Sequence, residues 1–391
     1  MNQTNPERIR SSCALLRELF EENFGAYGEL GASLSVYLHG EEILSLAAGF
    51  RDRQKTQPWT RETAVLLWSA TKGPAAACVL HLCEKKGIAL SSTVVSHWPE
   101  FAAAGKESVT LAQILSHQAG LAALSQRVPV LDHAAVAAAL AQEPPNWPPG
   151  TAHGYHPRTF GFLLDEIVRR ISGGISLGQY WRENFAQPLG LDLWIGADAA
   201  QDVAPIFPAR GGPPKGDVFY TAFLTTNSLT ARAFASPHGL HSIASMNTPE
   251  ARTASLPAFG GIGTASALAK FYAMLAQGGT WEGRTYFEAS TLAQMSQTLS
   301  QGQDLVLQMD SAFSAGFMRD PIGPDGVKKR HTFGASARAF GHPGAGGSHG
   351  FADPEQGLSF GYVMNQMETG VLPNPKSLRL VQALYPKSGN D

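Results

Sequence analysis

The segment Trp68-Ser69-Ala70-Thr71-Lys72-Gly73 places a serine and a lysine three residues apart. An apolar run, Ala64-Val65-Leu66-Leu67, precedes it, and an Ala-rich apolar run follows. If a helix starts near Ser69, this spacing puts both side chains on one face. Serine is a poor nucleophile at neutral pH, but a lysine that burial keeps neutral can accept its proton. The pair therefore predicts a nucleophile and its base, although an S-x-x-K pattern also arises by chance.

A tyrosine in His153-Gly154-Tyr155-His156-Pro157 is the first candidate companion. A turn signal, Asn146-Trp147-Pro148-Pro149-Gly150, precedes this segment, and a helix-like run from Thr159 to Ile171 follows it. A phenol at such a loop-to-helix junction can pass a proton between Ser69 and a leaving group. The alternative is an amphipathic tyrosine at a surface corner.

The second companion is the glycine-dense segment Phe340-Gly341-His342-Pro343-Gly344-Ala345-Gly346-Gly347. Its flanks are strand-like, and its glycines permit a close approach of the backbone to a ligand. An ordinary hairpin with bulges is the alternative.

The order S-x-x-K, loop tyrosine, glycine-rich strand resembles the serine β-lactamase and penicillin-binding-protein superfamily. Further segments are similar to those of the family VIII carboxylesterases, the esterase branch related to class C β-lactamases. The resemblance runs from about residue 30 to 385, and its further segments are Leu115-Ser116-His117-Gln118-Ala119-Gly120-Leu121, Gly260-Gly261-Ile262-Gly263-Thr264-Ala265, Asn227-Ser228-Leu229 and Arg232-Ala233-Phe234.

The resemblance implies a role for each motif residue. Ser69 would be the acylated nucleophile, Lys72 the general base and Tyr155 the group that shuttles the proton. The backbone N–H groups of Ser69 and Ala345 would form the oxyanion hole, which stabilises the developing negative charge.

Two departures from the superfamily pattern concern the substrate. Pro157 stands where β-lactamases and transpeptidases carry an amide side chain, and His342 stands where they carry a lysine. Histidine has a full positive charge only below its ordinary pKa of about 6.5. With His342 and Gly344 as expected substrate contacts, both departures favour neutral esters over anionic lactams. A His-x-Gly third motif also occurs among D-peptidases of the superfamily.

The expected fold class is α/β (α+β), a β-lactamase/transpeptidase-like antiparallel sheet flanked by helices with an inserted helical lobe. Residues 1–75 and 250–391 are expected to build the sheet domain, and residues 76–249 the mainly helical lobe. Strand patterns occur at Ala32–His39, Glu42–Gly49, Ser311–Arg319, Arg330–Gly341 and Leu358–Asn365, and a helical pattern occurs at Lys376–Tyr385.

A long loop around Pro205–Pro214 precedes two aromatic residues, Phe219 and Phe223. These side chains are expected to fold over Ser69 and bind an acyl or alcohol group. The alternative is that they anchor the loop to the core.

Two further segments match known catalytic motifs, but their context does not support a catalytic role. Gly346-Gly347-Ser348-His349-Gly350 fits the G-x-S-x-G elbow of α/β-hydrolases, but no histidine follows His349 and the next residues predict a strand hairpin. Lys387-Ser388-Gly389, a literal K-S-G, lies at the C-terminus, where a frayed tail is the default.

The composition fits a single enzyme of 391 residues, 43% of them hydrophobic. A net charge of −2 gives no reason to expect nucleic acid or an anionic membrane as partner. The three cysteines predict neither disulfides nor zinc. His153 and His156 have no third ligand at metal-site spacing, so we expect no metal and no cofactor.

The first twenty residues predict an amphipathic helix and not a signal peptide, and no run of about twenty apolar residues is present. A cytoplasmic location is therefore expected, with the oligomeric state left open.

The leading interpretation is a carboxylesterase that hydrolyses short-chain or aromatic esters through a Ser69 acyl-enzyme. The alternatives are a β-lactamase, a D-amino-acid peptidase or amidase, or an acyltransferase of the same superfamily. A non-catalytic binding or assembly protein is a third class.

Overall fold

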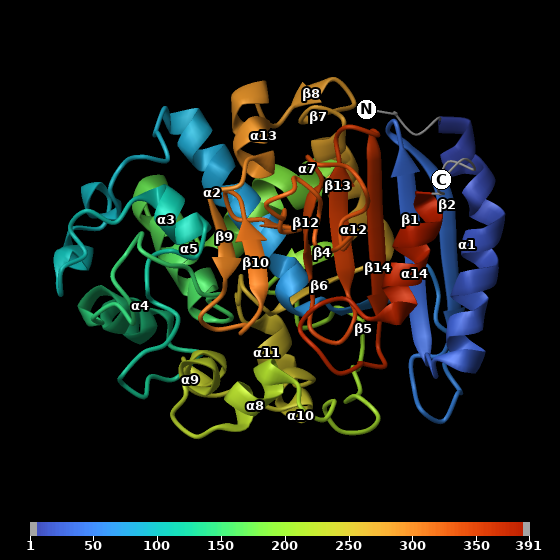
Figure 1. The fold of residues 1–391 in the computed structure, drawn as a ribbon, viewed down its shortest axis with the longest axis horizontal. Helices are drawn as coiled ribbons and strands as arrows, with labels where there is room; N and C mark the ends of the chain where they lie inside the picture. Colours follow the sequence, from blue (N-terminus) through green and yellow to red (C-terminus); the bar gives the residue numbers. More distant parts are fainter. Residues whose placement is uncertain (1–5, 386–391) are drawn as a thin grey trace.

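A computed structural model describes residues 6–385 of the chain (Figure 1). The predicted N-terminal helix is present as α1 (Pro6–Ala26). The first five residues of that prediction lie outside the described residues, and so does the Lys387-Ser388-Gly389 match.

The main sheet has eight antiparallel strands in the order β2-β1-β14-β13-β12-β11-β10-β9. The two ends of the chain meet in it, because β1 pairs with β14 from Ala32 opposite Met364 to Leu38 opposite Leu358. This confirms the predicted antiparallel sheet. The strands are β1 (Gly31–Leu38), β2 (Glu41–Gly49), β9 (Ser300–Gln303), β10 (Asp310–Phe313), β11 (Met318–Arg319), β12 (Phe340–Pro343), β13 (His349–Asp353) and β14 (Leu358–Met364).

Helices cover both faces of this sheet, and the alternation of side chains along β14 shows how. Ser359 donates a hydrogen bond to the Ala269 carbonyl of α12 (Ala265–Ala276) at 2.8 Å. A Cβ at Gly361 would lie 2.4 Å from a carbonyl of the same helix, so glycine allows α12 to pack closely. Phe360 and Tyr362 point to the opposite face, into a core shared with α1 and α14 (Pro375–Leu384).

A second, four-stranded sheet in the order β4-β6-β3-β5 was not predicted. It contains a parallel pair, β3 with β5, and its antiparallel β3–β6 pairing precedes Ser69 directly. A two-stranded ribbon, β7–β8, completes the strands. These strands are β3 (Ala64–Leu66), β4 (Leu193–Ile195), β5 (Val203–Ala204), β6 (Gly261–Gly263), β7 (Thr280–Trp281) and β8 (Arg284–Thr285).

Helices form the part of the molecule beside the β9–β10 end of the sheet, and several short helices lie along one border (Figure 1). The helix after Ser69, α2, packs against α5 and α6. The remaining helices are α2 (Lys72–Lys86), α3 (Leu111–Leu115), α4 (His133–Gln142), α5 (Thr159–Ser172), α6 (Leu177–Trp181), α7 (Gln187–Leu189), α8 (Val218–Leu224), α9 (Leu229–Ala235), α10 (Ile243–Met246), α11 (Pro249–Thr253) and α13 (Ala289–Ser296).

The predicted strand from Arg330 to Gly341 is wrong over most of its length, since β12 begins at Phe340. The backbone N–H groups of Thr332 and Phe333 donate to the Asp320 carboxylate at 3.0 and 3.1 Å. Lys328 also contacts that carboxylate, at 3.2 Å. These backbone N–H groups therefore bind the buried Asp320 carboxylate and cannot pair with a neighbouring strand.

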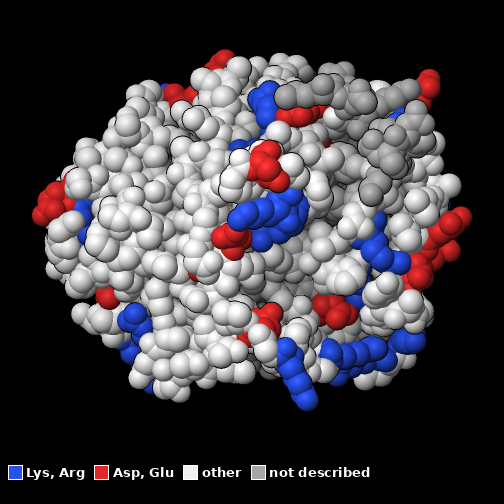
Figure 2. Space-filling view, in the orientation of Figure 1, with Lys and Arg blue, Asp and Glu red and all other residues white. Residues whose placement is uncertain are grey.

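Charged side chains are scattered over the face of the molecule in Figure 2, where both signs are interspersed and large areas are uncharged. Within residues 6–385, no helix has the length and apolar character that crossing a bilayer requires.

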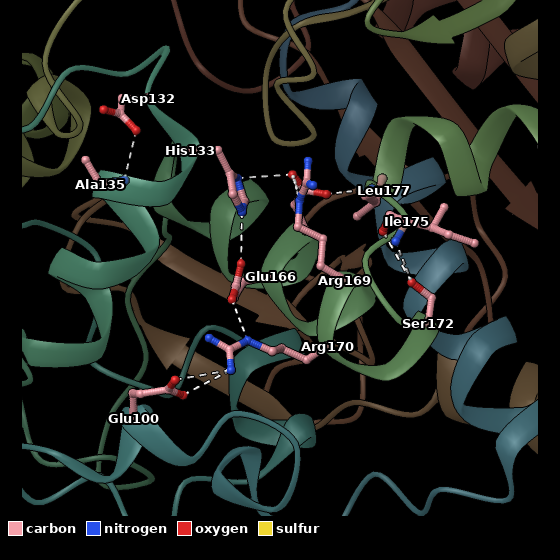
Figure 3. Close-up of polar contacts among 11 residues, drawn as sticks. Glu100, Asp132, His133, Ala135, Glu166, Arg169, Arg170, Ser172, Ile175 and Leu177 are labelled. Carbon is pink, nitrogen blue, oxygen red and sulfur yellow. Dashed lines mark hydrogen bonds and ion pairs between the residues drawn. The ribbon is translucent and has the colours of Figure 1, made fainter.

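A polar network joins α4 to α5, as Figure 3 shows. The His133 ring lies between two carboxylates of α5, with Nδ1 3.1 Å from Asp165 and Nε2 3.0 Å from Glu166. Arg170 extends the network, 2.7 Å from Glu166 and 3.1 Å from Glu100. These contacts fix α5, and the residues just before α5 belong to the site described below.

We predict that Glu166→Gln lowers the free energy of unfolding by about 1–2 kcal/mol at pH 7. The contact with His133, followed by Arg170, lowers the pKa of Glu166 to about 2 against the opposing effect of burial. A depressed carboxyl pKa stabilises the fold above the ordinary value of 4.5, and this contribution disappears as pH falls toward 2.

Urea unfolding at pH 7 and pH 3 measures this effect, with Glu18→Gln on the exposed face of α1 as the control. The difference between wild type and Glu166→Gln should shrink at pH 3. A difference that is the same at both pH values would show that the network does not act through the charge of Glu166.

Candidate active site

Ser69 lies at a sharp corner between β3 and α2. A short 3₁₀ helix, Trp68–Thr71, carries it there, so a helix does begin beside Ser69. Trp68 has a φ of 50°, a left-handed conformation that costs a bulky residue on the order of 1–3 kcal/mol. Contacts with β6 hold the corner, because Leu67 N–H donates to the Gly261 carbonyl at 2.8 Å and Gly261 N–H donates to Thr71 Oγ1 at 2.9 Å.

Lys72 opens α2 directly below Ser69 and is fully buried. Its Nζ lies 3.2 Å from Ser69 Oγ and 2.8 Å from each of the Pro157 and Ala258 carbonyl oxygens. Burial lowers the pKa of the Lys72 amine well below its ordinary value. A neutral amine has two N–H bonds, which suit the two carbonyls, and one lone pair, which then faces the serine hydroxyl.

Tyr155 lies beside this pair and is also buried. Lys72 Nζ is 4.7 Å from the centre of the Tyr155 ring, and the Ser69 side chain is near enough to the phenol to affect its pKa. Burial raises the pKa of Tyr155, and the Ser69 contact opposes this shift. The backbone N–H of Tyr155 donates to Asp304 at 3.0 Å, and its ring stacks on Phe313. The position of the phenol is therefore fixed by a backbone hydrogen bond and by the stacking of the ring.

Neutral histidines brace the tyrosine loop. The His156 backbone N–H donates to His117 Nδ1 at 3.1 Å, and the His117 ring centre is 5.1 Å from that of Tyr155. His156 Nδ1 donates to the Gly154 carbonyl at 2.7 Å, and burial lowers its pKa to about 3. Sequence reasoning singled out the segment containing His117 by resemblance but did not give it this packing role. In residues 6–385, no cluster of three or more His, Cys, Asp or Glu side chains could hold a metal ion.

The glycine-dense segment, which is the third motif, begins within β12, and His342 lies in that strand. His342 is 1% exposed, its Nδ1 donates to the Pro343 carbonyl at 2.8 Å, and burial lowers its pKa to about 3. A Cβ at Gly344 would lie 2.1 Å from the Leu67 carbonyl oxygen, so glycine brings this motif against the residues before Ser69. Neither residue is among those that line the pocket described next.

The backbone donors assigned to the oxyanion hole carry no competing bond. Ser69 N and Ala345 N donate to no backbone carbonyl within residues 6–385. Both residues line the same pocket.

The pocket has a volume of about 440 Å³. The predicted Phe219 and Phe223 lie in its wall together with Ser69, and both come from α8. Ala345, assigned to the oxyanion hole, and Pro157 also lie there. Sequence reasoning missed most of the other lining residues, including Arg158, which directly follows the tyrosine motif. The lining residues are Trp68, Ser69, Pro157, Arg158, Ala209, Phe219, Tyr220, Phe223, Ala231, Phe234, Ala235, Leu240, His241, Ile243, Phe259, Ala345, Met367, Glu368, Thr369, Gly370 and Val371.

Comparison with known proteins identifies the family of this chain. The family model described as Beta-lactamase matches residues 16–384. The protein named esterase/beta-lactamase LipL from Mycobacterium tuberculosis is 31% identical over 350 residues, which are 86% of this chain and 77% of that protein.

Three solved structures are similar over nearly the whole chain. A penicillin-binding protein homolog from Caulobacter crescentus is 37% identical, with a TM-score of 0.85 and 97% of each chain covered. A family VIII carboxylesterase is 35% identical, with a TM-score of 0.85 and 98% of each chain covered. EstA from Arthrobacter nitroguajacolicus Rue61a is 30% identical, with a TM-score of 0.80 and 94% of each chain covered. The chain therefore belongs to the Beta-lactamase family and is a serine hydrolase related to esterases of that family.

Proposed function

We propose that this protein is a carboxylesterase that hydrolyses short-chain or aromatic esters through an acyl-enzyme on Ser69. The observation that carries the proposal is the buried Lys72 amine, whose two carbonyl contacts leave its third direction for Ser69 Oγ, 3.2 Å away. A neutral amine in that position activates a serine hydroxyl as a general base.

In the acylation step, Lys72 accepts the Ser69 proton while Oγ bonds to the carbonyl carbon of the ester. The N–H groups of Ser69 and Ala345 bind the resulting oxyanion, and removing one such donor costs about 3 kcal/mol of transition-state stabilisation in comparable sites. Tyr155 then delivers a proton to the departing alkoxide and takes one from the Lys72 ammonium, so that the alcohol leaves, the acyl group stays on Ser69 and both side chains return to their neutral forms. A water molecule then attacks the carbonyl carbon of the acyl-enzyme with the same proton transfers, so that Ser69 leaves and the carboxylic acid is released.

We predict that Tyr155→Phe lowers kcat for esters by about 10²- to 10⁴-fold while the fold is retained. The variant keeps the ring that stacks on Phe313 and removes only the hydroxyl that contacts Ser69. Poor leaving groups should suffer most, because the phenol protonates the departing oxygen. Steady-state kinetics with ethyl and p-nitrophenyl esters measures the effect. An equal loss for both esters would contradict a role in leaving-group protonation.

Two features of the site support esters over lactams. Pro157 offers a carbonyl to Lys72 where an amide side chain would contact a peptide-like substrate. Burial lowers the pKa of His342 to about 3, so the third motif carries no positive charge at pH 7. The pocket wall is also largely apolar and aromatic, which suits acyl and aryl groups.

Turnover of p-nitrophenyl acetate, butyrate and octanoate, set beside turnover of the lactam nitrocefin, tests the proposal. We expect kcat/KM for the best ester to exceed that for nitrocefin by at least about 10²-fold. The name of the Mycobacterium tuberculosis relative includes both activities, which makes the lactam the appropriate competitor. Nitrocefin turnover equal to or above ester turnover would overturn the proposal in favour of amide chemistry.

A further inference from the structure

A cationic side chain without an acidic partner lies in the wall of the Ser69 pocket. Arg158 is 6% exposed and lines the cavity together with Ser69. Within residues 6–385, none of the ion pairs includes Arg158. Burial lowers the pKa of Arg158 to about 10, which still leaves the guanidinium charged at neutral pH.

The partners that Arg158 does have are neutral. Nη1 donates to the Phe234 carbonyl at 3.3 Å and to His241 Nδ1 at 2.7 Å, and Nη2 donates to the Gly239 carbonyl at 2.5 Å. The guanidinium also lies 4.8 Å from the centre of the Phe259 ring. A guanidinium has five N–H bonds, so the bond at Nε and one at Nη2 have no acceptor, and Nε is buried without a partner. The contacts orient the group but leave its charge uncompensated.

The acidic residue in the pocket wall is engaged elsewhere. Glu368 forms an ion pair with Lys376 at 2.8 Å, and Lys376 does not line the pocket. A buried cation without a counter-ion is unfavourable in an empty pocket and becomes favourable when an anion enters. The pocket wall is thus prepared for a negatively charged group at Arg158.

We propose that Arg158 recognises a carboxylate on the substrate, so that the preferred esters carry a free carboxylate near the scissile bond. This inference rests on the proposed esterase function and names its substrate class. Arg158 follows Pro157, whose carbonyl accepts a hydrogen bond from Lys72, so the binding cation and the base are joined through adjacent backbone positions.

Two pairs of esters test the recognition and locate the carboxylate. 4-Acetoxybenzoate and its methyl ester differ by a charge on the leaving-group side, whereas p-nitrophenyl hemiglutarate and p-nitrophenyl pentanoate differ by a charge on the acyl side. We expect the charged member of at least one pair to have a kcat/KM about tenfold higher, mainly through KM. Added salt should reduce this preference, because it screens the attraction.

Variants then assign the preference to Arg158. Arg158→Gln should reduce the ratio of charged to neutral kcat/KM about tenfold, and Arg158→Lys should retain part of it. Arg284→Gln removes one exposed positive charge from β8 and should leave the ratio unchanged. An equal loss for both members of a pair in Arg158→Gln would assign the residue a structural role and overturn the inference.

If Arg158→Gln does not fold, the charged-to-neutral ratio of kcat/KM in the wild type still tests carboxylate recognition. A charged-to-neutral ratio near or below one in both pairs would overturn carboxylate recognition while leaving the esterase function intact. If none of the four esters is hydrolysed, the proposed function itself fails.

Discussion

Replacing Ser69 by alanine is expected to lower kcat for p-nitrophenyl butyrate by about 10⁵- to 10⁶-fold, to the level set by pocket binding and the remaining backbone donors. Ser69 Oγ is the atom that bonds to the acyl group, and no neighbouring side chain can take its place at the corner before α2. The loss should appear in kcat far more than in KM, because the pocket wall stays intact. Initial rates with enzyme that shows wild-type circular dichroism measure the effect.

Ser348 provides a matched control, because its sequence context imitates a nucleophile elbow. It is fully buried beside the third motif, and it is absent from the residues that line the pocket. Ser348→Ala should therefore keep kcat within about threefold of wild type. If Ser348→Ala were inactive while Ser69→Ala retained turnover, the assignment of the nucleophile would be wrong.

The second large effect is expected at Lys72. Lys72→Met keeps the length of the side chain without a proton acceptor and should lower kcat/KM by at least about 10³-fold. Lys72→Arg should lose a comparable amount, because a guanidinium stays protonated at all working pH values and cannot act as a base.

The pH profile separates a base from a positioning group. The Lys72 pKa is lowered by burial, and the active form is the neutral amine, so kcat/KM should rise with pH through this lowered pKa. Activity should then stay high well below pH 10.4, where an ordinary lysine would lose its proton. The acidic limb should vanish from the residual activity of Lys72→Met. A limb that persists unchanged in this variant would show that another group controls the protonation state.

The predictable part of this molecule is local in the sequence. The β1–β2 hairpin follows from two strand patterns joined at Gly40-Glu41. Helical patterns predict α5 and α14, and the predicted ends differ from the observed ends by no more than one residue. The S-x-x-K spacing likewise predicts a serine and a lysine on one helical face, and the structure places their reactive atoms 3.2 Å apart.

The parts that sequence reasoning missed depend on contacts between distant residues. The segment after Arg330 looks strand-like, but Asp320 takes its backbone donors through a side-chain contact that no local pattern reveals. The β3–β5 pair joins residues 64 and 203 in parallel, which requires knowledge of the whole chain path. The sequence likewise does not single out Arg158, because its neutral partners Phe234, Gly239 and His241 lie far from it along the chain. The boundaries expected for two domains stay a prediction.

The covalent intermediate is the central claim, and intact-protein mass spectrometry after treatment with a fluorophosphonate tests it most directly. The wild type should gain the mass of a single phosphonyl group, and peptide mapping should place that group on Ser69. Ser69→Ala should gain none, and Ser348→Ala should be labelled like the wild type. An unlabelled wild type, or a label that persists in Ser69→Ala at the wild-type rate, would contradict the Ser69 acyl-enzyme.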